Sequence, residues 1–396
     1  MTETLGAILR NRRVLKRLSQ VAVGKALGYS RSWVSRAEGD LFTPEDDVLA
    51  AWCDLLGLSA EDVGRGGDDV LHRRRVLALG LGAGVSVALP TPAHAEEDSR
   101  ALVERALFRL PDARPVTRDA LVTGLSQARD LFHEAQYVQL GKNLPRLIST
   151  ASATGAHDVT ARAYVLLAQL ATKNHQQYAW IAADRARAEA RQSGNPLVMG
   201  EAAHALAISM RRAGEYESAV EQLQVAARDL EEPTPDHLAM RGTLLLTASY
   251  TSAATGWRSA ALGFLGEAEE IAKRKDTETE RLYIPGVFSL DHTRLFRVSV
   301  HHALGEGGEA LKYAARVDPQ RLPNAERRAR MMMDVARVFK DEGEPVRAFA
   351  ALRAMEKYAP EDVRRPKVRG IATELLAFNG DIPGLRRFAQ NIGAHV

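Results

Sequence analysis

The sequence predicts an all-α protein in which a small helix-turn-helix domain precedes a long array of helical hairpins. Two short helical segments joined by a glycine lie between residues 19 and 39. From about residue 101 onward, glycine and alanine recur at regular intervals, and no stretch shows the alternating pattern of a strand. The predicted domains are residues 1–63, a connection at 64–100, and residues 101–396. A chain of 396 residues is long enough for such a division.

The first helical segment begins after Ser19, a residue whose hydroxyl can cap a helix, and ends at Gly28, which tolerates a positive φ. Two residues later, Ser30 caps a second segment whose inward face is expected to be Val34 and Ala37. The apolar positions of the first segment are Val21, Ala22, Ala26 and Leu27.

The outward face of the second segment is rich in serine and arginine, the residue types that a recognition helix presents to bases in a major groove. The expected DNA contacts on this helix are Ser30, Arg31, Ser32, Ser35 and Arg36. Residues 1–36 hold eight basic side chains and one acidic side chain, a local net charge of +7, whereas the whole chain carries only +3. Positive charge is thus concentrated where phosphates would approach. The alternative is an ordinary helical hairpin with a solvated face.

Residues 5–58 resemble the lambda-repressor-like, Xre-type helix-turn-helix domain in their L-S-Q opening, glycine turn, S-x-x-x-S helix and E-x-G exit. The resemblance implies four or five helices and a dimer on a two-fold DNA site. It also implies that Gln20 contacts a phosphate and that Arg13 pairs with Glu38. Arg17 stands where the family usually has glycine, and it either tightens the turn or adds a phosphate contact.

The connection at 64–100 contains a glycine-rich break, three arginines at 73–75, an apolar run at 76–89 and a proline-containing stretch. This order resembles a twin-arginine secretion signal, yet it lies behind a folded domain and is too short for a comfortable membrane span. We expect an apolar linker helix packed on the next domain. A contact with a partner or a membrane surface, and a signal function, remain alternatives.

In the C-terminal part, glycine or asparagine turns recur every 37 to 49 residues, and each is followed five residues later by alanine or leucine. Small residues permit close helix crossings, and glycine permits the turn between the helices. The turns are Asn174, Gly214, Gly256, Gly305, Gly343 and Gly380; the residues five later are Ala179, Ala219, Ala261, Ala310, Ala348 and Leu385, with further alanines at Ala186, Ala226 and Ala268.

This pattern resembles tetratricopeptide-like repeats with a longer spacing than usual. A helix-turn-helix domain followed by such repeats is similar to signal-responsive regulators of Gram-positive bacteria, particularly actinobacteria, in which a small peptide binds the concave face. The resemblance implies a homodimer that binds double-stranded DNA as its operator and a small peptide, or another small molecule, as its signal.

If the first helix of each hairpin lines the concave face, its polar residues are candidates for holding the signal. These candidates are His204, Arg211, Tyr250, Arg294, Arg297, Arg330 and Asp334. Each has an alternative as a solvated surface residue. Asp291, Arg294 and Arg297 share one helical stripe, which can bind a carboxylate or form pairs three residues apart. One hypothesis is that Arg294, Arg297 and Arg330 hold a carboxylate or the carbonyls of a peptide.

No catalytic, metal or cofactor site is expected. The glycines at 80–84 lack the lysine and hydroxyl residue of a phosphate loop, and His301 and His302 point to different faces of a helix. Cys53 is the one cysteine, which excludes an internal disulfide, and it is expected to be buried.

Together these observations predict a cytoplasmic, nucleoid-associated transcriptional regulator that is not an enzyme. The alternatives are a repeat-based scaffold with auxiliary DNA binding and a membrane-associated regulator.

Overall fold

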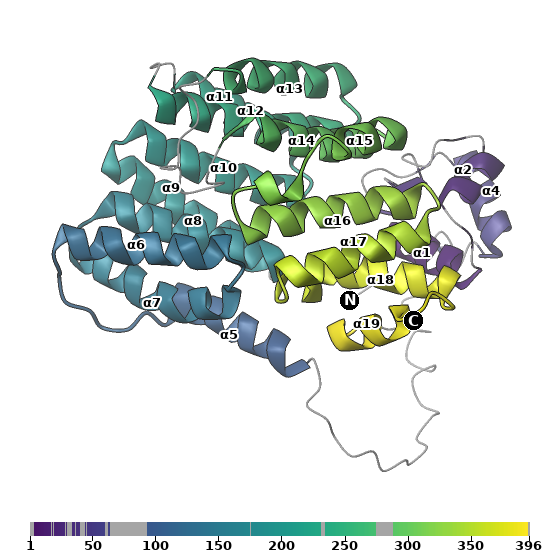
Figure 1. Ribbon diagram of the computed structural model, residues 1–396, viewed down its shortest axis with the longest axis horizontal. Helices are drawn as coiled ribbons and strands as arrows, with labels where there is room; N and C mark the ends of the chain where they lie inside the picture. The colour runs from purple at the N-terminus through teal and green to yellow at the C-terminus, as the bar shows by residue number, and fades with distance from the viewer. Residues whose placement is uncertain are drawn as a thin grey trace, which may run out of the picture. The chain divides into compact units, whose positions relative to one another are not determined.

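The computed structural model describes residues 4–16, 18, 20–27, 29, 34–35, 37–39, 44, 46–59, 62–63, 93–174, 176–230, 234–274 and 288–394 (Figure 1). Every regular element among these residues is a helix, which confirms the predicted all-α class. The chain divides into two compact units, Met1–His94 and Ala95–Val396, which are taken separately below. The expected connection at 64–92, including the apolar run at 76–89, lies outside the described residues.

The N-terminal unit contains α1 (Leu5–Leu15), α2 (Gln20–Leu27) and α4 (Asp46–Leu56). Thr4 caps α1, since its hydroxyl accepts a hydrogen bond from the backbone N–H of Ala7 at 3.3 Å. The core of this unit is formed by Leu9, Val23, Val34, Ala37, Leu49, Trp52, Cys53 and Leu56. Val34, Ala37 and Cys53 are therefore buried as predicted.

The buried face of α2 differs from the sequence-based expectation. Val23 and Gly24 are its buried residues, whereas Ala22 and Ala26 are exposed. Alanine is small and common on exposed helix surfaces, so its presence at helical spacing did not identify the inward face. The expected caps Ser19 and Ser30 and the expected turn residue Gly28 lie outside the described residues.

The C-terminal unit begins with α5 (Ala93–Phe108), whose first residues fall inside the expected 64–100 connection. Pairs of antiparallel helices then follow one another (Figure 1). The pairs are α6 (Arg118–His133) with α7 (Tyr137–Ala153), α8 (His157–Asn174) with α9 (Gln176–Ser193), α10 (Pro196–Arg212) with α11 (Tyr216–Arg228), α12 (Pro235–Thr255) with α13 (Arg258–Ala272), α14 (Leu290–Ala303) with α15 (Gly307–Ala314), α16 (Ala325–Asp341) with α17 (Pro345–Tyr358), and α18 (Pro366–Asn379) with α19 (Leu385–Ile392). Two 3-10 turns, η2 (Pro319–Arg321) and η3 (Asp362–Arg364), join the later pairs.

The predicted glycine turns connect the helices within these pairs. The backbone of Gly214, Gly256, Gly305 and Gly343 is left-handed, with φ of +91°, +84°, +80° and +77°. Gly380 is the exception, because its φ is −64° and the left-handed residue of that turn is Gly384, at +84°. The connection between α18 and α19 is longer than the others, which moves the left-handed position along the chain.

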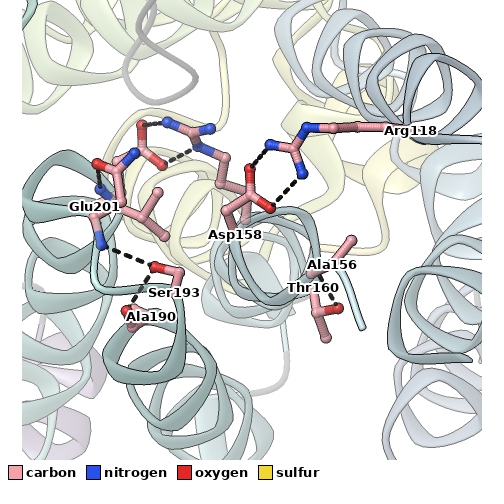
Figure 2. Close-up of polar contacts among 10 residues, drawn as sticks. Arg118, Ala156, Asp158, Thr160, Ala190, Ser193 and Glu201 are labelled. Carbon is pink, nitrogen blue, oxygen red and sulfur yellow. Dashed lines mark hydrogen bonds and ion pairs between the residues drawn. The ribbon is translucent and has the colours of Figure 1, made fainter. Parts of the chain in front are cut away.

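The alanines predicted at helix crossings are buried. Each of the residues five positions after a turn, and each of the further alanines, is 7 % exposed or less. Polar contacts also join the first helices of successive pairs. Arg118 on α6 forms an ion pair with Asp158 on α8 at 2.6 Å, as Figure 2 shows, and Arg162 on α8 forms one with Glu201 on α10 at 2.8 Å. These partners are 40 and 39 positions apart, which is one repeat.

The last pairs return to the first. In Figure 1 the succession of pairs rises from α6 to α13 and descends from α14 to α19, and α16 comes into contact with α6. Lys173 on α8 lies at this junction, and its Nζ is 2.9 Å from Oε1 of Glu326 on α16 and 3.4 Å from Oδ1 of Asp362 in η3. The same ammonium lies 4.9 Å from the ring centroid of Tyr137. We call this group the closing cluster.

Candidate functional site

In the N-terminal unit, a buried ion pair joins α1 to the segment that follows α2. Nε and Nη2 of Arg13, on α1, lie 2.5 and 2.8 Å from the two carboxylate oxygens of Glu38. Arg13 also donates to the carbonyl of Leu18 at 2.9 Å. Arg13 is 1 % exposed and Glu38 is 5 % exposed. The predicted pairing of these residues is confirmed, and it ties α1 to the segment that follows Val34 and Ala37.

Two of the seven predicted DNA contacts lie among the described residues. Gln20 is the first residue of α2, and its side-chain amide donates to Glu38 at 2.9 Å. The second hydrogen of this amide remains able to donate to a phosphate oxygen. Ser35 is half-buried beside Val34. The other predicted contacts, Arg17, Ser30, Arg31, Ser32 and Arg36, lie outside the described residues and stay predictions.

Part of the N-terminal positive charge serves the fold. Arg12 donates to the carbonyls of Leu56 at 3.2 Å and Gly57 at 3.1 Å, and Lys16 donates to the carbonyl of Leu55 at 3.3 Å. These carbonyls belong to the end of α4, where cations offset the negative end of the helix dipole. Part of the local charge of +7 is therefore used within the fold of this unit.

In the C-terminal unit, a cluster of polar residues gathers on the first helices of four pairs. The ring of Tyr250, on α12, is its centre. The guanidinium carbon of Arg211, on α10, lies 4.8 Å from the ring centroid, and that of Arg330, on α16, lies 6.0 Å from it. Arg211 also donates to the hydroxyl of Thr251 at 3.3 Å. Three of the seven predicted signal-binding residues therefore lie together.

A fourth predicted residue, Asp334, is the buried anion of this cluster. Its carboxylate lies 2.9 Å from Nε of Arg330 and 3.6 Å from Nη1 of Arg337, and it accepts a hydrogen bond from Ser299 at 2.5 Å. Burial of Asp334 disfavours its charge, but the positive charges of Arg330 and Arg337 prevail and hold the pKa of this carboxyl well below its usual range.

Two cations of the cluster were missed by the sequence analysis, Arg337 on α16 and Lys367 on α18. Arg337 lies two helical turns after Arg330 and so on the same face, a spacing that could have identified it. The positive charge of Arg337 lowers the pKa of Lys367, whose side chain is exposed, to about 7. We call Arg211, Tyr250, Arg330, Asp334, Arg337 and Lys367 the inner cluster.

The charges of the inner cluster change the pKa of Tyr250. Burial by itself would raise the pKa of its phenol. The positive charges of Lys367, Arg337, Arg211 and Arg330 outweigh burial and bring the pKa of Tyr250 down to about 7. The ionised form of Tyr250 is therefore stabilised by the cations that surround its phenol.

His204 on α10 and His292 on α14 are buried side chains on the first helices of their pairs. His204 is 6 % exposed, and its Nε2 lies 3.0 Å from the hydroxyl of Thr247. Burial, then the charge of Arg327, lowers the pKa of His204 to about 3 and that of His292 well below its usual value. Both ring nitrogens of His292 and Nδ1 of His204 have no hydrogen-bond partner among the described residues.

The remaining predicted residues, Arg294 and Arg297, are engaged elsewhere. Arg294 pairs with Asp291 at 2.8 Å, the alternative given by their spacing. Arg297 forms an ion pair with Glu269 on α13, and its guanidinium lies 5.0 Å from the ring centroid of Tyr313 on α15. Arg330 instead contacts Asp334 and Tyr250, so the structure does not gather the three arginines of the hypothesis around one point.

In the part of the chain that is described, no group of three His, Cys, Asp or Glu side chains could hold a metal ion. The described helices also include none that is both long and apolar enough to cross a membrane, and the apolar run at 76–89 lies outside that set.

Comparison with known proteins bears on the N-terminal unit. Residues 4–65 match the family model described as a helix-turn-helix domain. No curated protein and no solved structure matches the chain. The chain thus carries an N-terminal helix-turn-helix domain, followed by helices that repeat in pairs.

Proposed function

We propose that this protein is a sequence-specific DNA-binding transcriptional regulator. The observation that carries the proposal is the helix-turn-helix domain at residues 4–65, in which the buried pair of Arg13 and Glu38 supports the segment after α2. Arg31, Ser32, Ser35 and Arg36 would contact base edges, and Gln20, Ser30 and Arg17 would assist at the phosphates. A local charge of +7 over residues 1–36 favours association with DNA.

We further propose that the paired helices are tetratricopeptide-like repeats that bind a small signal, a peptide or another small molecule, and that the protein acts as a homodimer. Binding would change the spacing of two DNA-binding domains. Half-sites lie about one helical turn (roughly 34 Å) or a multiple apart, so such a change would alter affinity for the operator. In this proposal the protein works in the cytoplasm on the nucleoid, and by binding rather than by catalysis.

The alternative is a scaffold whose repeats recruit a partner protein. A surface for a folded partner usually presents a contiguous apolar patch. The inner cluster is instead charged and lies on the first helices of the pairs, which favours a small polar ligand. A membrane-associated regulator is a further alternative that depends on the run at 76–89, and cell fractionation would distinguish it.

DNA binding by the full chain on genomic fragments, at two salt concentrations, tests the proposal. Arg31→Ala and Arg36→Ala should each weaken specific binding by about 1–3 kcal/mol, the scale of one base contact. Lys312→Met serves as the control, because Lys312 is exposed on α15 and pairs only with Glu309 three residues away. Specific binding that survives both arginine substitutions would refute the assigned recognition helix.

A further inference from the structure

We propose that the inner cluster is a binding site for an oxyanion, a carboxylate or phosphate group carried by the small signal. This inference rests on the proposed sensing role of the repeats and names the chemical group that they recognise. The site consists of Arg211 on α10, Tyr250 on α12, Arg330 and Arg337 on α16, and Lys367 on α18, with Asp334 as their internal anion.

The charge of the inner cluster is unbalanced. It contains four basic side chains against the carboxylate of Asp334 and the phenol of Tyr250, and that carboxylate already forms ion pairs with Arg330 and Arg337. Among the described residues, neither Arg211 nor Lys367 has a carboxylate within ion-pair distance. Cations held close together repel one another, and the partly buried ones among them are stabilised by an opposite charge. An anion from outside would supply the missing charge.

The donor types fit an oxyanion better than another anion. Arginine presents a planar fork of N–H groups that matches the oxygens of carboxylate or phosphate, and lysine adds a compact charge. Arg211 and Arg330 both lie against the ring of Tyr250, which holds two of these forks beside one phenol. Oxygen atoms placed between them would accept hydrogen bonds from several helices at once.

Unpartnered groups nearby indicate where the rest of the ligand would lie. His292 is 3 % exposed on α14, and neither of its ring nitrogens has a hydrogen-bond partner among the described residues. Buried polar atoms in proteins are almost always satisfied. Burial, then the charge of Arg327, lowers the pKa of this imidazole, and the charges of His204 and Arg330 act in the same direction. A neutral imidazole offers one donor and one acceptor to the uncharged part of a ligand.

The same charge could have a purely structural role. In that case the stability of the rest of the array would offset the repulsion between the cations. An added oxyanion would then show no saturable binding. The two roles differ in whether an oxyanion in solution binds stoichiometrically, and in whether substitution of Lys367 weakens that binding. Lys367 is exposed, so its substitution should leave folding intact.

The test uses the full chain, calorimetry and three probes at constant ionic strength: inorganic phosphate, trialanine, and trialanine with an amidated C-terminus. We expect one saturable site for phosphate or trialanine and none for the amide. Phosphate alone would indicate a phosphorylated signal, and trialanine alone would indicate the carboxylate of a peptide. Saturable binding of neither probe would overturn the proposal.

The matched variants are Lys367→Met and Lys312→Met. Lys367→Met should weaken binding about tenfold or more, the scale of one charge-assisted hydrogen bond, and Lys312→Met should not change it. Equal affinities in the two variants would overturn the proposal. A second readout is the absorbance of tyrosinate, since a bound oxyanion should raise the pKa of Tyr250, and Tyr250→Phe should remove that step. DNA binding is measured separately, so failure of the anion site and failure of the regulator proposal are distinguishable.

Discussion

Lys173 on α8 and Glu326 on α16 stand 153 positions apart in the sequence, yet Nζ of Lys173 and Oε1 of Glu326 lie 2.9 Å apart in a buried ion pair. Asp362 shares the same ammonium at 3.4 Å. Open arrays of helical pairs contact only their neighbours. Here the closing cluster joins an early pair to two later elements, α16 and η3.

Lys173→Met should destabilise the array, because it leaves two buried carboxylates without their shared cation. We expect the free energy of unfolding to fall by about 3 kcal/mol, the low end for a broken buried pair, since Arg327 and Arg365 still contact Glu326 and Asp362. Hydrogen exchange should rise first in α6 and α16. Lys142→Met, at an exposed residue of α7, is the control, and equal unfolding curves for both variants would contradict the assigned role.

The buried pair of the N-terminal unit allows a similar experiment. Arg13→Met should lower the stability of that unit by about 3–5 kcal/mol, because Glu38 is left as an uncompensated buried charge. The double variant with Glu38→Leu should recover part of the loss. Hydrogen exchange of α1 and α2 amides measures the effect, and Lys25→Met, at an exposed residue of α2, should leave it unchanged. A double variant less stable than Arg13→Met would count against this explanation.

Much of this fold could be predicted because it depends on local pattern. Glycine at a left-handed turn and alanine at a crossing leave a direct mark on the sequence, so Gly214 and Ala219 were identified correctly. Gly380 was not, since the length of its turn is decided by how α18 and α19 pack. Ala22 and Ala26 did not identify the inward face of α2, because alanine is also common on exposed helix surfaces.

The candidate site was predicted less completely. Arg211, Tyr250 and Arg330 were selected because they lie on first helices, and the structure brings them together. Arg297 was selected for the same reason, but Glu269 on the preceding helix holds its guanidinium. The sequence alone does not specify which neighbouring helix lies within reach of a long side chain. Lys173 went unnoticed because its partners are more than 150 positions away.

Gly242→Ala tests the packing between α12 and the segment before α14. A Cβ at this glycine would lie 2.1 Å from the ring of Phe288, which is fully buried. We expect a loss of about 1–3 kcal/mol in urea unfolding, the usual cost of overpacking. Gly263→Ala on α13 meets no atom within 4 Å and should instead stabilise the helix by about 0.5–1 kcal/mol. Equal effects of the two substitutions would show that α12 and Phe288 are not packed in this way.

The buried histidines predict sensitivity to acid. The pKa of His204 is about 3 in the folded chain, below its ordinary value of 6.5, so the unfolded chain binds the extra proton as pH falls below 6.5. Stability contributed by neutral His204 is therefore complete above pH 6.5 and is lost as pH falls toward 3, at about 1.4 kcal/mol per pKa unit. His204→Gln should flatten the decline of the unfolding free energy between pH 6.5 and 4. Lys142→Gln, at an exposed residue of α7, should retain the wild-type slope, and parallel curves for all three proteins would refute the prediction.

The closing cluster also restricts how such a protein can evolve. Open arrays lengthen or shorten by duplication or deletion of a hairpin, because each new unit needs only two neighbours. In this chain an added hairpin would carry α16 past α8 and separate Lys173 from Glu326 and Asp362. The contact between an early and a late pair therefore opposes any change in the number of hairpins between them. Variation in this protein would have to proceed by substitution along the helices, with the number of pairs unchanged.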